Sequence, residues 1–193
     1  MQRGRIHLQN LISGLVLYHG SYMTVEAPDI ARCAKFKDFG QGFYLTSSLE
    51  QARNFARLTL RKAKANGIVG PNEQRAFVSR YRFVDDGAPL NIHAFQSADK
   101  EWLHCIAAHR KQGLFPEVLE EFSNYDVIVG KIANDQTNAT LVNYMAEAFG
   151  PVGSAQADQI CASLLLPERL KDQFCFRTPQ SLAHLEFEGA DCL

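Results

Sequence analysis

His19 has neighbours that suit ligand chemistry, because Gly20 and Ser21 follow it at the end of an apolar segment. A glycine lets a ligand approach the backbone closely, since no Cβ stands in the way. The N–H and C=O groups there can hold an amide, and the imidazole can bond a sugar hydroxyl. The alternative is a structural histidine that bonds a carbonyl in a turn, and so short a match favours this alternative when taken alone.

A second candidate segment is residues 38–46, which reads Asp-Phe-Gly-Gln-Gly-Phe-Tyr-Leu-Thr. Two glycines separated by one residue bend the chain sharply, so Tyr44 follows directly after a turn. Phe55 lies on the helix predicted next. Two such aromatic faces could sandwich a flat ring, and a cationic nicotinamide is attracted to a π face. The alternative is a turn followed by core aromatics.

Gln173 lies in a third segment, residues 171–178, in which apolar residues alternate with polar ones as in a half-buried strand that starts at Gln173. A glutamine at the start of a strand predicts no chemistry by itself. It gains meaning only from its order in the chain after the other two segments.

Regular elements of both kinds must position these residues. A helix is predicted from Ser48 to just before Gly67, and Gln51 three residues after Ser48 completes a capping-box pattern. The predicted strands are residues 14–19, 77–83, 125–130 and 173–176. The other predicted helices are residues 99–111, 141–149 and 156–165. A short segment around residues 182–187 follows near the end of the sequence. Strands and helices do not alternate strictly, which predicts an α+β fold rather than a doubly wound one.

Composition favours a globular protein with its own core. The chain has 193 residues, of which 46% are hydrophobic, and a formal net charge of −1. This length predicts one domain, residues 1–193. The balanced charge argues against a surface built mainly to grip phosphate backbones, although a local basic patch remains compatible with it.

The cysteines and the apolar runs indicate in which cellular compartment the protein is expected. The apolar run at residues 11–17 is too short to span a bilayer and no cleavage pattern follows it, so no membrane association is expected. The 5 cysteines form no CxxC pair and have no histidine at metal-ligand spacing, which predicts reduced thiols and no metal site. We expect a cytoplasmic protein, or an effector delivered without an N-terminal signal.

Taken in order, the three segments resemble the ADP-ribosyltransferase superfamily, on the His-Tyr-Glu side that includes poly-ADP-ribose polymerases and diphtheria-type toxins. The three places of that pattern correspond to His19, Tyr44 and Gln173. The resemblance implies two packed antiparallel or mixed sheets that form an NAD cleft with flanking helices.

The chain is also similar to a bacterial domain family of unknown function placed in that superfamily. The shared motifs cover most of residues 15–187 and are Tyr18 to Ser21, Asp38 to Thr46, Glu101 to Leu103, Tyr125 to Asp135 and Gln173 to Thr178. No single motif is decisive, and the resemblance rests on all of them occurring in order.

The resemblance implies roles for individual residues. His19 would bind the adenine-side ribose, Gly20 would hold the carboxamide, and Tyr44 would stack on the nicotinamide with Phe55 as the second aromatic. The other residues expected to line the NAD site are Ser21, Gly42, Phe43 and Asp135.

Gln173 departs from the superfamily, whose active members usually carry a glutamate there. A glutamine can accept a bond from the 2′-hydroxyl of the nicotinamide ribose but supplies no negative charge to an oxocarbenium-like transition state. Losing such a contact costs on the order of 3 kcal/mol. Asp135 and Asp172 are candidates for a substituting carboxylate, and Asp135 is equally well explained as a helix cap. On electrostatics alone, Gln173→Glu is expected to keep or raise NAD⁺ cleavage.

The expected function is therefore an NAD⁺-dependent mono-ADP-ribosyltransferase, a bacterial toxin or effector. NAD⁺ would be the substrate, a protein or nucleic acid the acceptor, and a small antitoxin a further partner. The alternatives are an NAD⁺ glycohydrolase and a catalytically inactive module that binds NAD⁺ or ADP-ribose.

Overall fold

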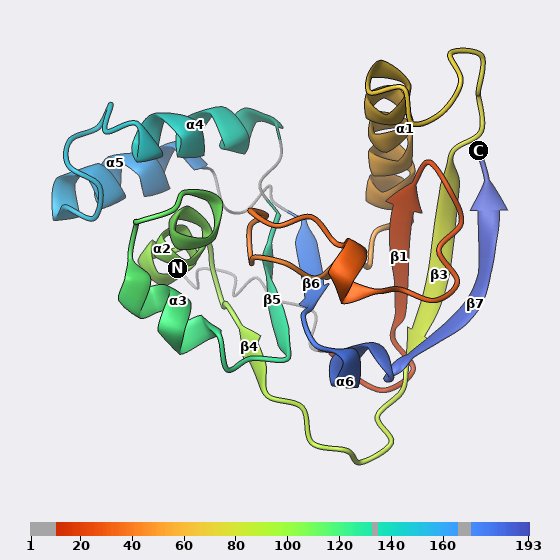
Figure 1. Ribbon diagram of the computed structural model, residues 1–193. Coiled ribbons are helices and arrows are strands. Elements are labelled where there is room, and N and C mark those ends of the chain that lie inside the picture. The colour runs from red at the N-terminus through yellow and green to blue at the C-terminus, as the bar shows by residue number, and fades with distance from the viewer. Residues whose placement is uncertain (1–10, 133–134, 166–170) are drawn as a thin grey trace, which may run out of the picture.

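The computed structural model describes residues 11–132, 135–165 and 171–193, without the side chains of residues 135 and 136 (Figure 1). Its strands form two sheets. In the first, β3 (Phe77–Phe83) lies between β1 (Val16–Ser21) and β7 (Leu185–Cys192), and all neighbours are antiparallel. The second sheet has the order β2 (Phe43–Leu45), β6 (Asp172–Phe176), β5 (Val127–Lys131) and β4 (Ile92–Ala94). Only β4 and β5 run parallel.

Helices cover the outer faces of both sheets. Figure 1 shows α2 (Lys100–Arg110), α3 (Pro116–Phe122), α4 (Asp135–Met145) and α5 (Ala155–Leu165) gathered on the side of the second sheet that faces away from the first. The long helix α1 (Leu49–Ala65) packs on β1 and β3. Two short helices, η1 (Ile30–Arg32) and α6 (Pro179–Leu182), lie in the connections. The α+β class with two antiparallel or mixed sheets is therefore confirmed, whereas the extent of one domain stays a prediction.

The second sheet separates two apolar clusters, and this decides where polar side chains on its strands can lie. Phe174 and Phe176 of β6 pack between the two sheets, whereas Cys175 packs against α2 and its neighbouring helices. Successive side chains of a strand point to opposite faces. Gln173 therefore faces the helices, as Cys175 does.

Several local signals in the sequence are realised. Ser48 caps α1 by accepting a hydrogen bond from the Gln51 N–H, and Gly67 follows the helix with a positive φ of 68°. Only half of the predicted capping box forms, because the buried Gln51 Oε1 has no hydrogen-bond partner among the described residues. Asp99 caps α2 in the same way through the Trp102 N–H.

Other boundaries differ from the sequence-based expectation. Helix α4 begins at Asp135, inside the stretch expected to be a polar loop before a helix at 141–149. The closing segment expected at 182–187 is divided between α6 and the longer strand β7. The short elements β4 and α3 were not expected. Each is held by its neighbours in space, which a pattern of so few residues does not reveal.

Candidate functional site

Strands β1 and β2 form a fork just where the sequence places His19 and Tyr44. They pair only between Tyr18 and Thr46, whose backbones exchange hydrogen bonds of 2.8 and 3.0 Å. In a continued antiparallel ladder the next bonded pair would join Gly20 to Tyr44. Instead the His19 imidazole Nδ1 bonds the Tyr44 carbonyl at 2.9 Å. We call residues 18–20 and 44–46 the β1–β2 fork.

The fork leaves the backbone groups on one edge of Gly20 without a strand partner, although the residue as a whole is buried. Bonded pairs alternate along β1, so the backbone groups of Gly20 point away from β3, on the same side as those of Tyr18. No described residue forms a hydrogen bond with the Gly20 N–H or C=O on that side. One donor and one acceptor therefore lie side by side on a free strand edge.

The protonation state of His19 follows from its contacts. A carbonyl oxygen only accepts, so Nδ1 must carry the proton and Nε2 is left as an acceptor. The ring centroid lies 4.5 Å from that of Phe43. Burial lowers the pKa of His19, and the bond to the Tyr44 carbonyl only partly opposes this effect. The imidazole is therefore neutral at pH 7, with an acceptor nitrogen available to a hydroxyl group.

Gly20 has a structural reason to be a glycine. A Cβ at this position would lie 2.0 Å from the Ala52 carbonyl oxygen and 2.7 Å from the Ala56 nitrogen of α1. The close approach of α1 therefore explains the residue type without any ligand. The open backbone edge of Gly20 is a separate feature, which any residue could present if α1 lay further away.

Tyr44 is held by its hydroxyl group. Its Oη donates to the Gly40 carbonyl at 2.8 Å and accepts from the Phe39 N–H at 2.9 Å. Burial, with the nearby Cys175 and Asp38 adding to it, raises the pKa of Tyr44 well above its ordinary value. The hydroxyl is therefore neutral and already bonded, so a ligand would meet the ring of this partly exposed residue rather than its hydroxyl group.

The glycines of the 38–46 turn also have packing reasons. A Cβ on Gly42 would lie 2.5 Å from the Cys175 sulfur, and one on Gly40 would lie 2.5 Å from the His109 ring. Gly40 also has a φ of +80°, which side chains rarely adopt. Phe43 packs in the core between the sheets. Contacts of Gly42 and Phe43 with NAD⁺ stay predictions.

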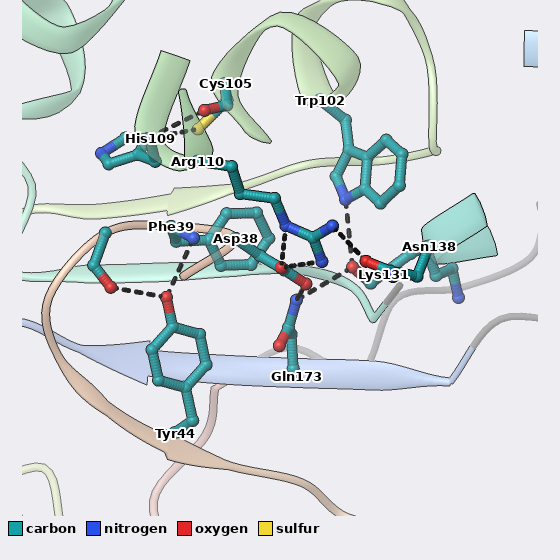
Figure 2. A network of polar contacts seen from close by, with 11 residues as sticks. Asp38, Phe39, Tyr44, Trp102, Cys105, His109, Arg110, Lys131, Asn138 and Gln173 are labelled. Atoms are coloured by element: carbon teal, nitrogen blue, oxygen red, sulfur yellow. Dashed lines mark hydrogen bonds and ion pairs between the residues drawn. The ribbon is translucent and has the colours of Figure 1, made fainter. Parts of the chain in front are cut away.

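Gln173 lies in a buried polar network, which Figure 2 shows. The side chain is only 4% exposed, and its Nε2 donates to Asp38 Oδ2 at 2.9 Å and to the Lys131 carbonyl at 3.1 Å. Trp102 Nε1 donates to the same carbonyl at 3.1 Å. Because both partners of Nε2 are acceptors, the orientation of the amide is fixed. No described residue donates to Oε1 of Gln173.

Arg110 holds Asp38 from the other side. Its Nε and Nη2 donate to Asp38 Oδ1 at 2.9 and 2.5 Å, and its Nη1 donates to Asn138 Oδ1 at 2.7 Å. We call Gln173, Asp38, Arg110, Asn138 and the Lys131 carbonyl the Gln173 network. Sequence reasoning gave Asp38 and Arg110 no role. The 38–46 motif already contained Asp38, but no local signal connects it to Arg110, which is 72 residues away.

The structure brings Tyr44 and Gln173 to one face of the second sheet. Tyr44 is paired with Cys175, two residues after Gln173, and both Tyr44 and Cys175 pack on the helix side. The 38–40 turn joins them, because it contacts the Tyr44 hydroxyl and the Gln173 amide. His19 contacts Phe43, which lies on the opposite face of β2. No contact joins His19 to Gln173 among the described residues.

The remaining candidate residues lie in different environments. Phe55 is 41% exposed and lies on α1 between Ala52 and Ala56, the residues that approach Gly20. Ser21 is buried at the end of β1. The carboxylate of Asp172 is bonded to Lys131 Nζ at 2.7 Å.

Asp135 was expected to bind the cofactor, and its side chain lies outside the described residues. Helix α4 begins at this residue. Neither the ligand role nor the capping role of the carboxylate is therefore decided.

Two surface hollows lie away from these residues. One, of about 340 Å³, is lined by side chains of α2 and α3, and the other, of about 330 Å³, lies along residues 83–92. Within the described ranges, no group of three or more His, Cys, Asp or Glu side chains is arranged to hold a metal ion. Nor is any described helix long and apolar enough to cross a membrane.

Comparison with known proteins gives one match. A family model with the description "Protein of unknown function (DUF3990)" matches residues 15–187, which include the β1–β2 fork and the Gln173 network. No curated protein and no solved structure matches the chain.

Proposed function

This chain belongs to the DUF3990 family, and we propose that it is an NAD⁺-dependent mono-ADP-ribosyltransferase with an ADP-ribosyltransferase fold. The observation that carries the proposal is the unpaired backbone edge of Gly20 in the β1–β2 fork, which has no hydrogen-bond partner among the described residues. The nicotinamide carboxamide has an oxygen that accepts and an NH₂ group that donates. It can therefore bond the N–H and C=O of Gly20 as a further strand would.

The neighbours of Gly20 suit the rest of the cofactor. The His19 Nε2 is an acceptor for a hydroxyl of the adenine-side ribose, because its Nδ1 proton is already bonded to Tyr44. The partly exposed ring of Tyr44 offers a face on which the nicotinamide can stack, and Phe55 is the second aromatic. Gln173 Oε1 is the acceptor for the 2′-hydroxyl of the nicotinamide ribose.

The proposed reaction breaks the bond between C1′ of that ribose and the nicotinamide nitrogen. Nicotinamide leaves with the electron pair, and an oxocarbenium-like sugar remains. A nucleophile of the acceptor then attacks C1′ and gives up its proton. Holding the sugar in place contributes most, because Gln173 brings an oriented dipole and no charge of its own.

Labelled NAD⁺ incubated with the purified protein and a bacterial lysate tests the proposal. We expect label on a protein or nucleic acid, with nicotinamide released in equal amount, and at least a tenfold lower rate for His19→Ala, a loss of about 1.4 kcal/mol. Release of free ADP-ribose alone would indicate a glycohydrolase. If calorimetry detects no NAD⁺ binding by the wild type, the proposal is wrong.

One observation favours an alternative, a module that binds NAD⁺ or ADP-ribose without turnover. Gln173 is 4% exposed, and its Nε2 is already bonded twice. Binding without release of nicotinamide would support this alternative.

A toxin or effector role, acting in the cytoplasm with an antitoxin as partner, is part of the proposal. Expression in a bacterial cytosol should slow growth, and His19→Ala should relieve the effect. Equal growth at matched expression would contradict the toxin role and leave the enzymatic one open.

A further inference from the structure

We infer that Asp38, held by Arg110, is the positioning residue that turns the amide oxygen of Gln173 toward the substrate. The inference rests on the proposed function for the identity of that substrate.

The first step is the direction of the hydrogen bonds. A carboxylate and a carbonyl can only accept, so Asp38 Oδ2 and the Lys131 carbonyl both require a donor at this end of residue 173. The Gln173 amide meets this requirement with Nε2. Its Oε1 must then lie at the opposite end, where no described residue donates to it and a ligand hydroxyl can.

The second step explains why the residue is a glutamine. A glutamate at this position would place a second carboxylate against Asp38 and against the Lys131 carbonyl, with no donor between them. Two carboxylates in one site cannot both ionise without a strong increase in the pKa of one. This reverses the expectation, drawn from charge alone, that Gln173→Glu keeps or raises NAD⁺ cleavage.

The third step is the role of Arg110. Asp38 is 7% exposed, and a buried carboxylate needs a compensating partner. Arg110 supplies two bonds to Oδ1 and leaves Oδ2 for Gln173. The bond from Gln173 is therefore made to an anion, which strengthens it and polarises the amide. A polarised amide oxygen is a better acceptor for the 2′-hydroxyl.

A reversed hydrogen bond tests the inference. In Asp38→Asn, Oδ1 can still accept from Arg110, but Nδ2 now faces Nε2 of Gln173. Turning the glutamine amide relieves this clash and moves Oε1 away from the substrate side, at the cost of setting Oε1 against the Lys131 carbonyl. Combining Asp38→Asn with Gln173→Glu restores a donor and an acceptor with opposite polarity and the same net charge. The matched control is Glu73→Gln, which breaks an exposed pair with Arg75.

Thermal unfolding and nicotinamide release are measured for the wild type, both single variants, the double variant and the control. We expect Gln173→Glu to lower the Tm by roughly 6 °C or more, and Asp38→Asn to lower it by less. The double variant should recover most of the loss, although the Lys131 carbonyl still repels the introduced carboxylate. The control should change the Tm by about 1 °C at most. Asp38→Asn should release nicotinamide at least tenfold more slowly than wild type.

The two readouts separate the inference from the proposed function. If the Tm losses of the single variants simply add in the double variant, Asp38 does not orient Gln173 and the inference is wrong. It is equally wrong if folded Asp38→Asn is as active as wild type. Recovery of Tm without any NAD⁺ binding by the wild type would uphold the orientation by Asp38 and reject the proposed function. Should the variants not fold, slow exchange of the Gln173 side-chain amide protons in wild-type NMR spectra supports the inference, and fast exchange overturns it.

Discussion

The β1–β2 fork and the Gln173 network differ in what their polar atoms already bind. In the fork, the Gly20 backbone groups and the His19 Nε2 have no partner among the described residues. In the network, Gln173 donates to Asp38 and to the Lys131 carbonyl, and Arg110 donates to Asp38. Among the described residues, Oε1 of Gln173 has no donor. The fork offers unpaired groups at a strand edge, whereas most polar groups of the network are already bonded within the protein.

This difference indicates that the fork is suited to ligand binding and that the Gln173 network is suited to stabilising the fold. A ligand that enters the fork gains hydrogen bonds without breaking any within the protein. A change in the network leaves buried donors, acceptors or charges without partners, which costs stability before any ligand arrives. Substitutions should therefore act on the free energy of unfolding in the network, and on NAD⁺ affinity at His19.

The largest effect is expected where a buried charge loses its partner. Asp38→Ala removes the carboxylate that balances the charge of Arg110 and one of the two acceptors of Gln173 Nε2, and it should lower the free energy of unfolding by about 3–5 kcal/mol, measured by urea denaturation. Asp29→Ala removes an exposed ion pair with Arg32 and the side-chain cap of η1, and it serves as the exposed control, with a loss of about 1 kcal/mol. If both variants lower the free energy of unfolding equally, the Gln173 network is no more important for stability than an exposed ion pair.

The next effect is expected at Gly20, where the fork meets α1. A Cβ would overlap the Ala52 carbonyl oxygen, so Gly20→Ala should lower the free energy of unfolding by about 2–3 kcal/mol. Gly70→Ala is the matched control, because nothing lies within 4 Å of its Cβ position. A Gly20→Ala protein as stable as the control would show that α1 does not pack as described.

A smaller effect is expected at the Tyr44 hydroxyl, which connects the two regions. Tyr44→Phe leaves the Phe39 N–H and the Gly40 carbonyl without this partner and should lower the free energy of unfolding by about 1–2 kcal/mol. Tyr44→Ala should also weaken NAD⁺ binding, because it removes the ring. If calorimetry gives the same affinity for Tyr44→Ala and wild type, the stacking role is wrong.

The smallest effect is a pH dependence at His19. Its folded-state pKa is lowered, so protonation is disfavoured in the fold, and the acceptor Nε2 is present at neutral pH. NAD⁺ affinity should be constant at neutral pH and fall only as the pH drops through the lowered pKa of His19, below the ordinary histidine value of about 6.5. The stability contribution of neutral His19 has the same sign, since it is present above that pH and lost as the pH falls. His19→Ala should bind about tenfold more weakly, with no such decrease; a parallel decrease in both proteins would assign it to another group.

Several elements were predictable because their signals are local. Helix α1 follows from the Ser48 cap and the apolar spacing after it, and β3 occupies the predicted residues 77–83. Strand β5 is buried throughout, as its continuous apolar run indicates. The start of α4 was missed, because the polar residues before it resemble a loop.

The candidate site was predictable only as a set of residues. The motifs named His19, Tyr44 and Gln173, and the fork does join His19 to Tyr44 through one hydrogen bond. The role of the 38–46 turn in holding Gln173 could not be predicted from the sequence motifs. Its aspartate bonds a glutamine 135 residues away, and no periodicity or spacing carries information over such a separation.

The sequence by itself determined the α+β class, most element positions and the residues worth testing, because capping and hydrophobic alternation depend on near neighbours. Only the tertiary structure decided that Gly20 is a glycine because of α1, and that its outer backbone groups have no hydrogen-bond partner among the described residues. It likewise decided that Gln173 faces Asp38. A hydrogen bond between distant segments depends on where the chain returns, and the packing of the two sheets and their helices sets that.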